Sequence, residues 1–98
     1  MKPHIEKLQA NWLDSYGHLN EAYYIVAFSN ATWPLQNHFG IGDKYFRTTG
    51  NALYTLESHI RYIKEVRAPA TLIIHSTILG LSQKKLWIAH QLEVDKKL

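Results

Sequence analysis

The chain has 98 residues, of which 46% are apolar and 19% are charged, and its formal net charge is +3. This length allows one small domain, and this composition excludes a disordered chain. Because the sequence contains no cysteine, disulfide bonds, thiolate metal sites and a cysteine nucleophile are also excluded.

The mildly basic balance suits an anionic small ligand, but no dense run of Lys and Arg indicates nucleic-acid binding. The longest apolar run, Tyr23–Phe28, is far shorter than the ~20 residues that cross a bilayer, and the N-terminus lacks the apolar core of a signal peptide. We therefore expect a cytoplasmic protein without membrane or nucleic-acid partners. Because so short a chain buries a small share of its surface, we also expect a homo-oligomer.

The N-terminal part predicts a strand, a turn and a helix. His4–Trp12 alternates loosely and predicts a first strand. Its apolar members are Ile5, Leu8 and Trp12. Turn-forming residues follow at 14–20, and Asn20 stands at the N-cap position of a helix that starts near Glu21, whose charge favours a helix N-terminus.

Much of the surface of this helix is apolar, so we expect the rest of the chain to wrap around it. Two neighbouring stripes carry Ala22, Ile25, Val26, Ser29 and Trp33, and Tyr24, Phe28, Ala31 and Leu35. Pro34 removes a backbone donor and clashes with the carbonyl of Asn30, so the helix is expected to kink or restart there. Thr32 or Trp33 would then cap a last turn that ends at Gly40.

The C-terminal part predicts mainly strands. After a short helical turn over Lys44–Thr49, the pattern changes to period two, and Ala52–Val66 predicts a long strand. Thr71–Gly80 and Lys85–Val94 predict two further strands, joined through residues 81–84 in an antiparallel hairpin. One early helix followed by such strands predicts the α+β class, with an antiparallel sheet wrapped around a central helix.

The segment Trp12–Tyr24 reads W-L-D-S-Y-G-H-L-N-E-A-Y-Y. It resembles the D-x-x-G-H-x-N motif, followed by a helix rich in Tyr and Phe, of hotdog-fold acyl-CoA thioesterases of the 4-hydroxybenzoyl-CoA thioesterase type. Tyr54–Val66 resembles the long strand after the helix in that family. Together with residues 78–80 and 84–86, it is most similar to the betainyl-CoA thioesterases of carnitine breakdown.

The resemblance covers essentially the whole chain and implies hydrolysis of a small acyl-CoA, with betainyl-CoA favoured. It also implies a homodimer or a dimer of dimers, no metal, and no cofactor other than the coenzyme A of the substrate. Hotdog domains usually add one more strand after the one that ends near Val94 here. We therefore expect residues 1–98 to be a single domain that is truncated or unusually short, with an exposed sheet edge.

In the family, an aspartate at the position of Asp14 acts as the nucleophile or as the general base for water. The helix N-terminus at Asn20 and Glu21 would stabilise the thioester oxygen, and Gly17 would let the ligand approach the backbone of a tight turn. The residue types alone also allow Asp14 to be a simple turn former and Asn20 a simple N-cap. His18 would orient the substrate, hydrogen-bond Asp14, or only fix the turn.

Glu57 and His59 share one face of the predicted long strand with Arg61. Because the active site of a hotdog dimer lies between the subunits, Glu57 as a catalytic residue and His59 as a positioning residue would meet Asp14 of the other subunit. The alternative is an outer sheet face with cross-strand pairs. Three predicted strands carry His59, His75 and His90. Their spacing does not match a metal motif, so no metal site is expected.

Aromatic residues gather around the motif and the helix, at Trp12, Tyr16, Tyr23, Tyr24 and Trp33. The faces of such rings would bind the quaternary ammonium of a betainyl group; alternatively, the rings are core and interface residues. Cations suited to the phosphates of coenzyme A, or to ordinary solvated loops, are Lys64, Arg67, Lys84 and Lys85. A catalytically silent acyl-CoA-binding or assembly module of the same fold is the alternative to an enzyme.

Overall fold

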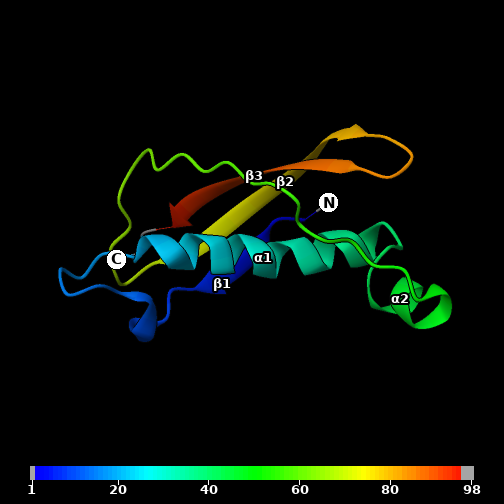
Figure 1. Cartoon of the computed structure of the whole chain (residues 1–98). Helices are drawn as coiled ribbons and strands as arrows, with labels where there is room; N and C mark the ends of the chain where they lie inside the picture. Colours follow the sequence, from blue (N-terminus) through cyan, green and yellow to red (C-terminus); the bar gives the residue numbers. More distant parts are fainter. Residues whose placement is uncertain (1, 96–98) are drawn as a thin grey trace.

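A computed structural model describes residues 2–95 of the chain. The elements, in chain order, are β1 (His4–Lys7), the 3-10 helix η1 (Ala10–Trp12), α1 (Glu21–His38), α2 (Asp43–Thr49), β2 (Thr71–Leu81) and β3 (Leu86–Asp95). The strands form one antiparallel sheet in the order β1-β2-β3, and α1 lies along one face of this sheet (Figure 1). The predicted α+β class is confirmed.

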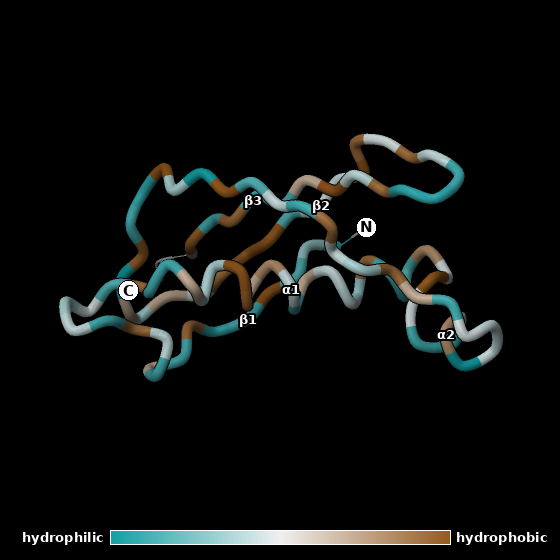
Figure 2. The backbone as a smooth tube through the Cα atoms, in the orientation of Figure 1, coloured by the Kyte–Doolittle hydropathy of each residue, from teal (hydrophilic) through white to brown (hydrophobic). Residues whose placement is uncertain are grey.

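The core lies where α1 packs on the central strand β2. Ala27 and Ala31 of α1 and Leu72 and Ile74 of β2 are almost completely buried. The small side chains let the helix approach the sheet closely, and the larger aliphatic side chains of the strand fill the remaining space. Hydrophobic residues accordingly follow β2 behind the helix (Figure 2). The same core cluster continues towards the turn before α1, through Trp12, Leu19, Tyr24 and Val66.

Polar contacts flank this apolar centre on both sides of α1. On the side of β1, the Asn30 amide donates hydrogen bonds of 3.1 and 3.3 Å to the two carboxylate oxygens of Glu6. On the side of β3, the Thr32 hydroxyl lies 3.0 Å from Nε2 of His90, whose Nδ1 lies 2.7 Å from the Ser76 hydroxyl. The helix is therefore attached to all three strands, to the outer two through hydrogen bonds.

The first strand is shorter than predicted, and its apolar residue Ile5 is exposed. The prediction of a strand over residues 4–12 is wrong beyond Lys7, because the chain leaves the sheet and η1 turns the Trp12 side chain into the core. Ile5, one of the three apolar members of the predicted strand, is 60% exposed. Its neighbour Glu6 faces α1 instead, where the hydrogen bonds to Asn30 satisfy the carboxylate.

The expected restart of the helix at Pro34 is wrong. α1 continues without interruption through this residue, and neither Thr32 nor Trp33 caps a new turn. Proline removes one N–H donor from the helix, but the next residue, Leu35, is buried and holds the last turn against the core. The Thr32 hydroxyl donates to the carbonyl of the residue four positions earlier, inside the same helix.

The short second helix and the C-terminal hairpin are confirmed. α2 covers the predicted helical turn, and β2 pairs with β3 in antiparallel register. The register shifts after Ile78, which faces Ile88, so that Gly80 faces Trp87. A Cβ atom at Gly80 would lie 3.3 Å from the Trp87 ring, so the glycine makes room for the indole at this bulge.

The predicted long strand over residues 52–66 is wrong. Residues 51–66 have no regular secondary structure, and most of their side chains are exposed. A strand needs the edge of a neighbour for its backbone hydrogen bonds. β1 and β3 occupy both edges of β2, and within residues 2–95 the outer edges of β1 and β3 do not pair with this segment. Within residues 2–95, no helix is long and apolar enough to span a membrane.

Candidate active site

The loop before α1 is organised around the carboxylate of Asp14. Its Oδ1 accepts the backbone N–H groups of Tyr16 at 2.8 Å and of His18 at 3.1 Å, and its own N–H donates to the carbonyl of His18 at 2.8 Å. Gly17 completes the turn with a φ of 79°, a region that favours glycine, so the predicted tight turn is confirmed. Within residues 2–95, the backbone donors bind Oδ1, which leaves Oδ2 for a ligand or a water molecule.

The N-terminus of α1 follows directly. The Asn20 side chain accepts the N–H of Ala22 at 3.0 Å, so the predicted N-cap and the start of the helix at Glu21 are confirmed. The carbonyl of Asn20 accepts the N–H of Tyr23. Among the described residues, the N–H of Glu21 finds no acceptor, so it is the helix donor that is open to a ligand oxygen.

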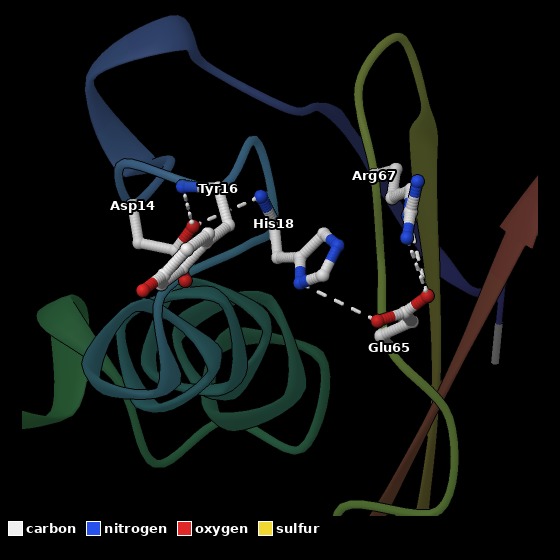
Figure 3. A network of polar contacts seen from close by, with 5 residues as sticks. All are labelled: Asp14, Tyr16, His18, Glu65 and Arg67. Atoms are coloured by element: carbon white, nitrogen blue, oxygen red, sulfur yellow. Dashed lines mark hydrogen bonds and ion pairs between the residues drawn. The ribbon is translucent and has the colours of Figure 1, made fainter.

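His18 links the Asp14 loop to the segment before β2 (Figure 3). Its ring points away from Asp14, and Nδ1 lies 3.4 Å from the carboxylate of Glu65, which also pairs with Arg67 at 3.1 Å. The backbone reinforces this link, because the N–H of Leu19 donates to the carbonyl of Val66 at 2.7 Å. Of the roles expected for His18, the fixing of the turn is therefore supported by direct contacts. His18 binds Asp14 through its backbone N–H and carbonyl groups, while its ring contacts Glu65.

These two segments form the walls of an open groove of about 490 Å³. The groove is lined by Asp14, His18, Leu19, Asn20, Glu21, Tyr24, Tyr62, Ile63, Lys64 and Glu65. It thus brings a carboxylate and the free end of a helix to one place. Such a pair can deliver an oxygen nucleophile to a carbonyl carbon and stabilise the negative charge that develops on the carbonyl oxygen.

The predicted aromatic residues separate into three environments. Trp12 stacks on Tyr23, with ring centroids 5.8 Å apart, and its own side chain is buried in the core. Tyr16 is 83% exposed, and its contact with Asp14 is made through the backbone. Tyr24 alone of these four lines the groove, where burial raises the pKa of its phenol. Trp33 is exposed on α1, away from this group.

Glu57 and His59 are not brought to Asp14 within one chain. Both side chains are exposed in the segment that lacks the predicted strand, and neither lines the groove. Their expected contact with Asp14 of another subunit stays a prediction. Their even spacing does not place them on one face of a sheet, because residues 51–66 form no strand.

The four predicted phosphate-binding cations lie in two regions. Lys64 lines the groove, and Arg67 pairs with the carboxylate of Glu65 beside it. Lys84 and Lys85 lie in the turn between β2 and β3, at the opposite end of the sheet (Figure 1). A single chain therefore offers Lys64 near Asp14, while the role of the hairpin lysines stays a prediction.

The histidines expected on three strands lie in different surroundings. His75 pairs with Glu93 at 2.8 Å on the outer face of the sheet, whereas His90 lies on the inner face against α1. His59 belongs to the exposed segment. Within residues 2–95, no group of three or more His, Asp or Glu side chains is arranged to hold a metal ion.

Tyr62 and Glu65 line the groove, although the sequence alone predicts no role in the site for either of them. The ring of Tyr62 contacts Tyr24 edge to face, with centroids 5.1 Å apart. Glu65 joins His18 to Arg67 across the groove wall. No local pattern marks either residue, because each reaches the site through the tertiary fold.

Comparisons with known proteins show the family to which the chain belongs. The family model described as the Thioesterase-like superfamily matches residues 8–98. The chain is 37% identical over 81 residues to a betainyl-CoA thioesterase of Pseudomonas aeruginosa, in an alignment that covers 83% of this chain and 51% of that protein. It is 34% identical over 90 residues to an L-carnitine dehydrogenase/betainyl-CoA thioesterase of Agrobacterium fabrum, covering 92% of this chain and 18% of that one. The chain thus spans about half of the first relative and less of the second.

Solved structures share the fold. A "putative thioesterase" from Pseudomonas putida KT2440 superposes with a TM-score of 0.81 at 33% identity, over 93% of this chain and 59% of that one. A Staphylococcus aureus protein solved in complex with CoA superposes with a TM-score of 0.89 at 22% identity, over 95% of this chain and 59% of that one. The hotdog fold expected from the sequence is therefore confirmed.

Proposed function

Because this chain belongs to the thioesterase-like superfamily, we propose that it hydrolyses the thioester bond of a small acyl-CoA to the free acid and coenzyme A. The observation that carries the proposal is the geometry of Asp14. Its carboxylate is held through Oδ1 by two backbone N–H groups and lines a groove beside the open N-terminus of α1.

In the proposed reaction, an oxygen adds to the thioester carbonyl, the C–S bond breaks, and the coenzyme A sulfur leaves with a proton. Asp14 either takes the proton from the attacking water or attacks the carbonyl itself, and water then hydrolyses the resulting anhydride. The N–H of Glu21, at the positive end of the helix dipole, stabilises the oxygen as it gains charge. A donor in this role typically contributes about 3 kcal/mol to barrier lowering.

The favoured acyl group is betainyl. Two relatives that are 37% and 34% identical to this chain bear that name, and the groove beside Asp14 carries two tyrosine rings. Lys64 lines the groove, and we propose that it contacts a phosphate of coenzyme A. We propose a homo-oligomer as well, because Ile25 and Trp33 stay exposed on α1. A cytoplasmic location stays a prediction.

The experiment is thiol release from a panel of acyl-CoAs that includes betainyl-, acetyl- and benzoyl-CoA. The protein has no cysteine, so a thiol reagent detects only released coenzyme A. Asp14→Asn preserves an acceptor for the two N–H groups and is expected to lower kcat/KM about 10²- to 10⁴-fold. Asp43→Asn, in the first turn of α2, is the matched control and should leave turnover unchanged.

Two outcomes would contradict the proposal. Full activity of Asp14→Asn would remove this carboxylate from the reaction. An absence of turnover with every ester, in a sample shown to be folded by circular dichroism, would favour the silent acyl-CoA-binding module. That alternative predicts thermal stabilisation by coenzyme A without hydrolysis.

A further inference from the structure

The groove beside Asp14 has more negative charge than the hydrolysis step requires. Besides Asp14, its lining includes the carboxylates of Glu21 and Glu65, against one lysine, Lys64. Glu65 is compensated by its pairs with His18 and Arg67, but Glu21 has no cationic partner among residues 2–95. An excess of negative potential attracts a cationic group.

Tyr62 supplies an aromatic surface at the same place. Its side chain is 51% exposed, so part of the ring is open to a ligand, while its hydroxyl donates to the carbonyl of Glu21 at 3.4 Å. The ring also contacts Tyr24, with an angle of 81° between the ring planes. These two contacts hold the Tyr62 ring next to the start of α1, within the groove that Asp14 lines.

A quaternary ammonium has no N–H to donate, so ordinary hydrogen-bond acceptors cannot recognise it directionally. It binds to the faces of aromatic rings and responds to the electrostatic potential around it. We propose that Tyr62 is a specificity-determining residue, which selects a quaternary ammonium in the acyl group together with Tyr24 and the negative charge of Glu21. This inference rests on the proposed function, because the acyl group must reach Asp14.

The test compares two esters that differ only in charge. Betainyl-CoA and 3,3-dimethylbutanoyl-CoA have the same shape, since a carbon atom in the second replaces the ammonium nitrogen of the first. The wild type is expected to prefer betainyl-CoA. Tyr62→Leu should lower kcat/KM for betainyl-CoA about 2- to 30-fold and change the value for the neutral ester less than about 2-fold. Tyr62→Phe keeps the ring and should retain most of the preference.

Two further variants sharpen the comparison. Tyr54→Leu removes a tyrosine from the same segment at a position that is 81% exposed and outside the groove, so it should change kcat/KM for neither ester. Glu21→Gln keeps the backbone N–H and removes the negative charge, so it should lower the ratio of kcat/KM for the cationic ester to kcat/KM for the neutral ester. If Tyr62→Leu lowers kcat/KM for both esters equally, the tyrosine has a structural role only. A wild type that turns over both esters equally would also overturn the subsite while leaving the hydrolase intact.

A different failure would concern the reaction itself. If the folded wild type hydrolyses neither ester, the proposed function fails, and the subsite is then tested by binding. Choline and its neutral analogue 3,3-dimethylbutan-1-ol are titrated by NMR against wild type and Tyr62→Leu. Preferential binding of choline that is lost in the variant would support the subsite, and equal or absent binding would overturn it.

Discussion

The hydroxyl of Thr32 lies 3.0 Å from Nε2 of His90, a residue 58 positions further along the chain. The same hydroxyl donates its single proton to the carbonyl of Phe28 at 2.9 Å, so it can only accept from His90. Nε2 of the neutral ring therefore carries the proton, and Nδ1 accepts from the hydroxyl of Ser76 at 2.7 Å. The ring also stacks on Phe28, with centroids 5.5 Å apart. One histidine thus joins α1, β2 and β3.

This position makes stability depend on pH. Burial lowers the pKa of His90 below the ordinary value of 6.5, so between the two values the unfolded chain binds more protons than the folded one. The contribution of His90 to the free energy of unfolding is complete above about pH 6.5 and is lost as the pH falls through the folded-state pKa. In urea unfolding, the difference between wild type and His90→Gln should shrink on acidification.

The exposed His59 provides the control for this experiment. His59→Gln should leave the dependence of the free energy of unfolding on pH as it is in the wild type. Two other titratable side chains, His4 and Glu6, face α1 from β1. A profile that is identical in wild type and His90→Gln would assign the pH dependence to those other groups.

The N-cap of α1 should matter for stability as well as for the site. Asn20→Ala removes the acceptor of the Ala22 N–H and is expected to lower the free energy of unfolding by about 1 kcal/mol. Asn20→Asp keeps an oxygen at the same position and should retain the stability. Chemical denaturation of the three proteins measures the effect, and an Ala variant as stable as the Asp variant would show that the cap contributes nothing.

Gly17 offers a test of backbone strain without steric conflict. Its φ is 79°, and a Cβ atom built there would meet nothing within 4 Å. Gly17→Ala should therefore destabilise the fold by about 1–2 kcal/mol through the left-handed conformation alone. Gly17→Asn should destabilise the fold less, because asparagine adopts the left-handed conformation more readily than alanine. Equal unfolding midpoints for the two variants would contradict this explanation.

The contact between α1 and β2 should not tolerate a larger side chain. Ala31 is almost completely buried against the core, so Ala31→Leu is expected to cost about 1–3 kcal/mol by overpacking. Ala22→Leu places the same side chain on an exposed position of the same helix and should be close to neutral. Thermal unfolding compares the two, and similar melting temperatures would mean that the helix can move away from the sheet.

The features that follow from local chemistry could be predicted from the sequence. The start of α1 follows from Asn20 and Glu21, the turn from Asp14 and Gly17, and the hairpin from the period of the last two strands. Each of these depends on contacts between residues close in the chain, so its signal is present in a short window.

The features that depend on distant partners could not be predicted in the same way. The alternation in residues 52–66 is typical of a strand, but pairing depends on distant segments of the chain, and none of the three described strands pairs with this one. Ile5 is the apolar residue of β1, yet Glu6 is the residue that faces α1, because Asn30 of the helix donates hydrogen bonds to its carboxylate. Tyr62 reaches the groove through contacts between distant parts of the chain, among them the backbone hydrogen bond from Leu19 to Val66.

The two polar attachments of α1 also determine its rotation about its own axis. Asn30 and Thr32 are two positions apart, which in an α-helix corresponds to about 200° around the axis, so they extend towards opposite sides. A rotation in one sense would stretch the bond from Asn30 to β1, and a rotation in the other sense would stretch the contact of Thr32 with β3. The outward stripe of Ile25 and Trp33 is therefore presented at a fixed angle, as a rigid template for any surface that packs on it.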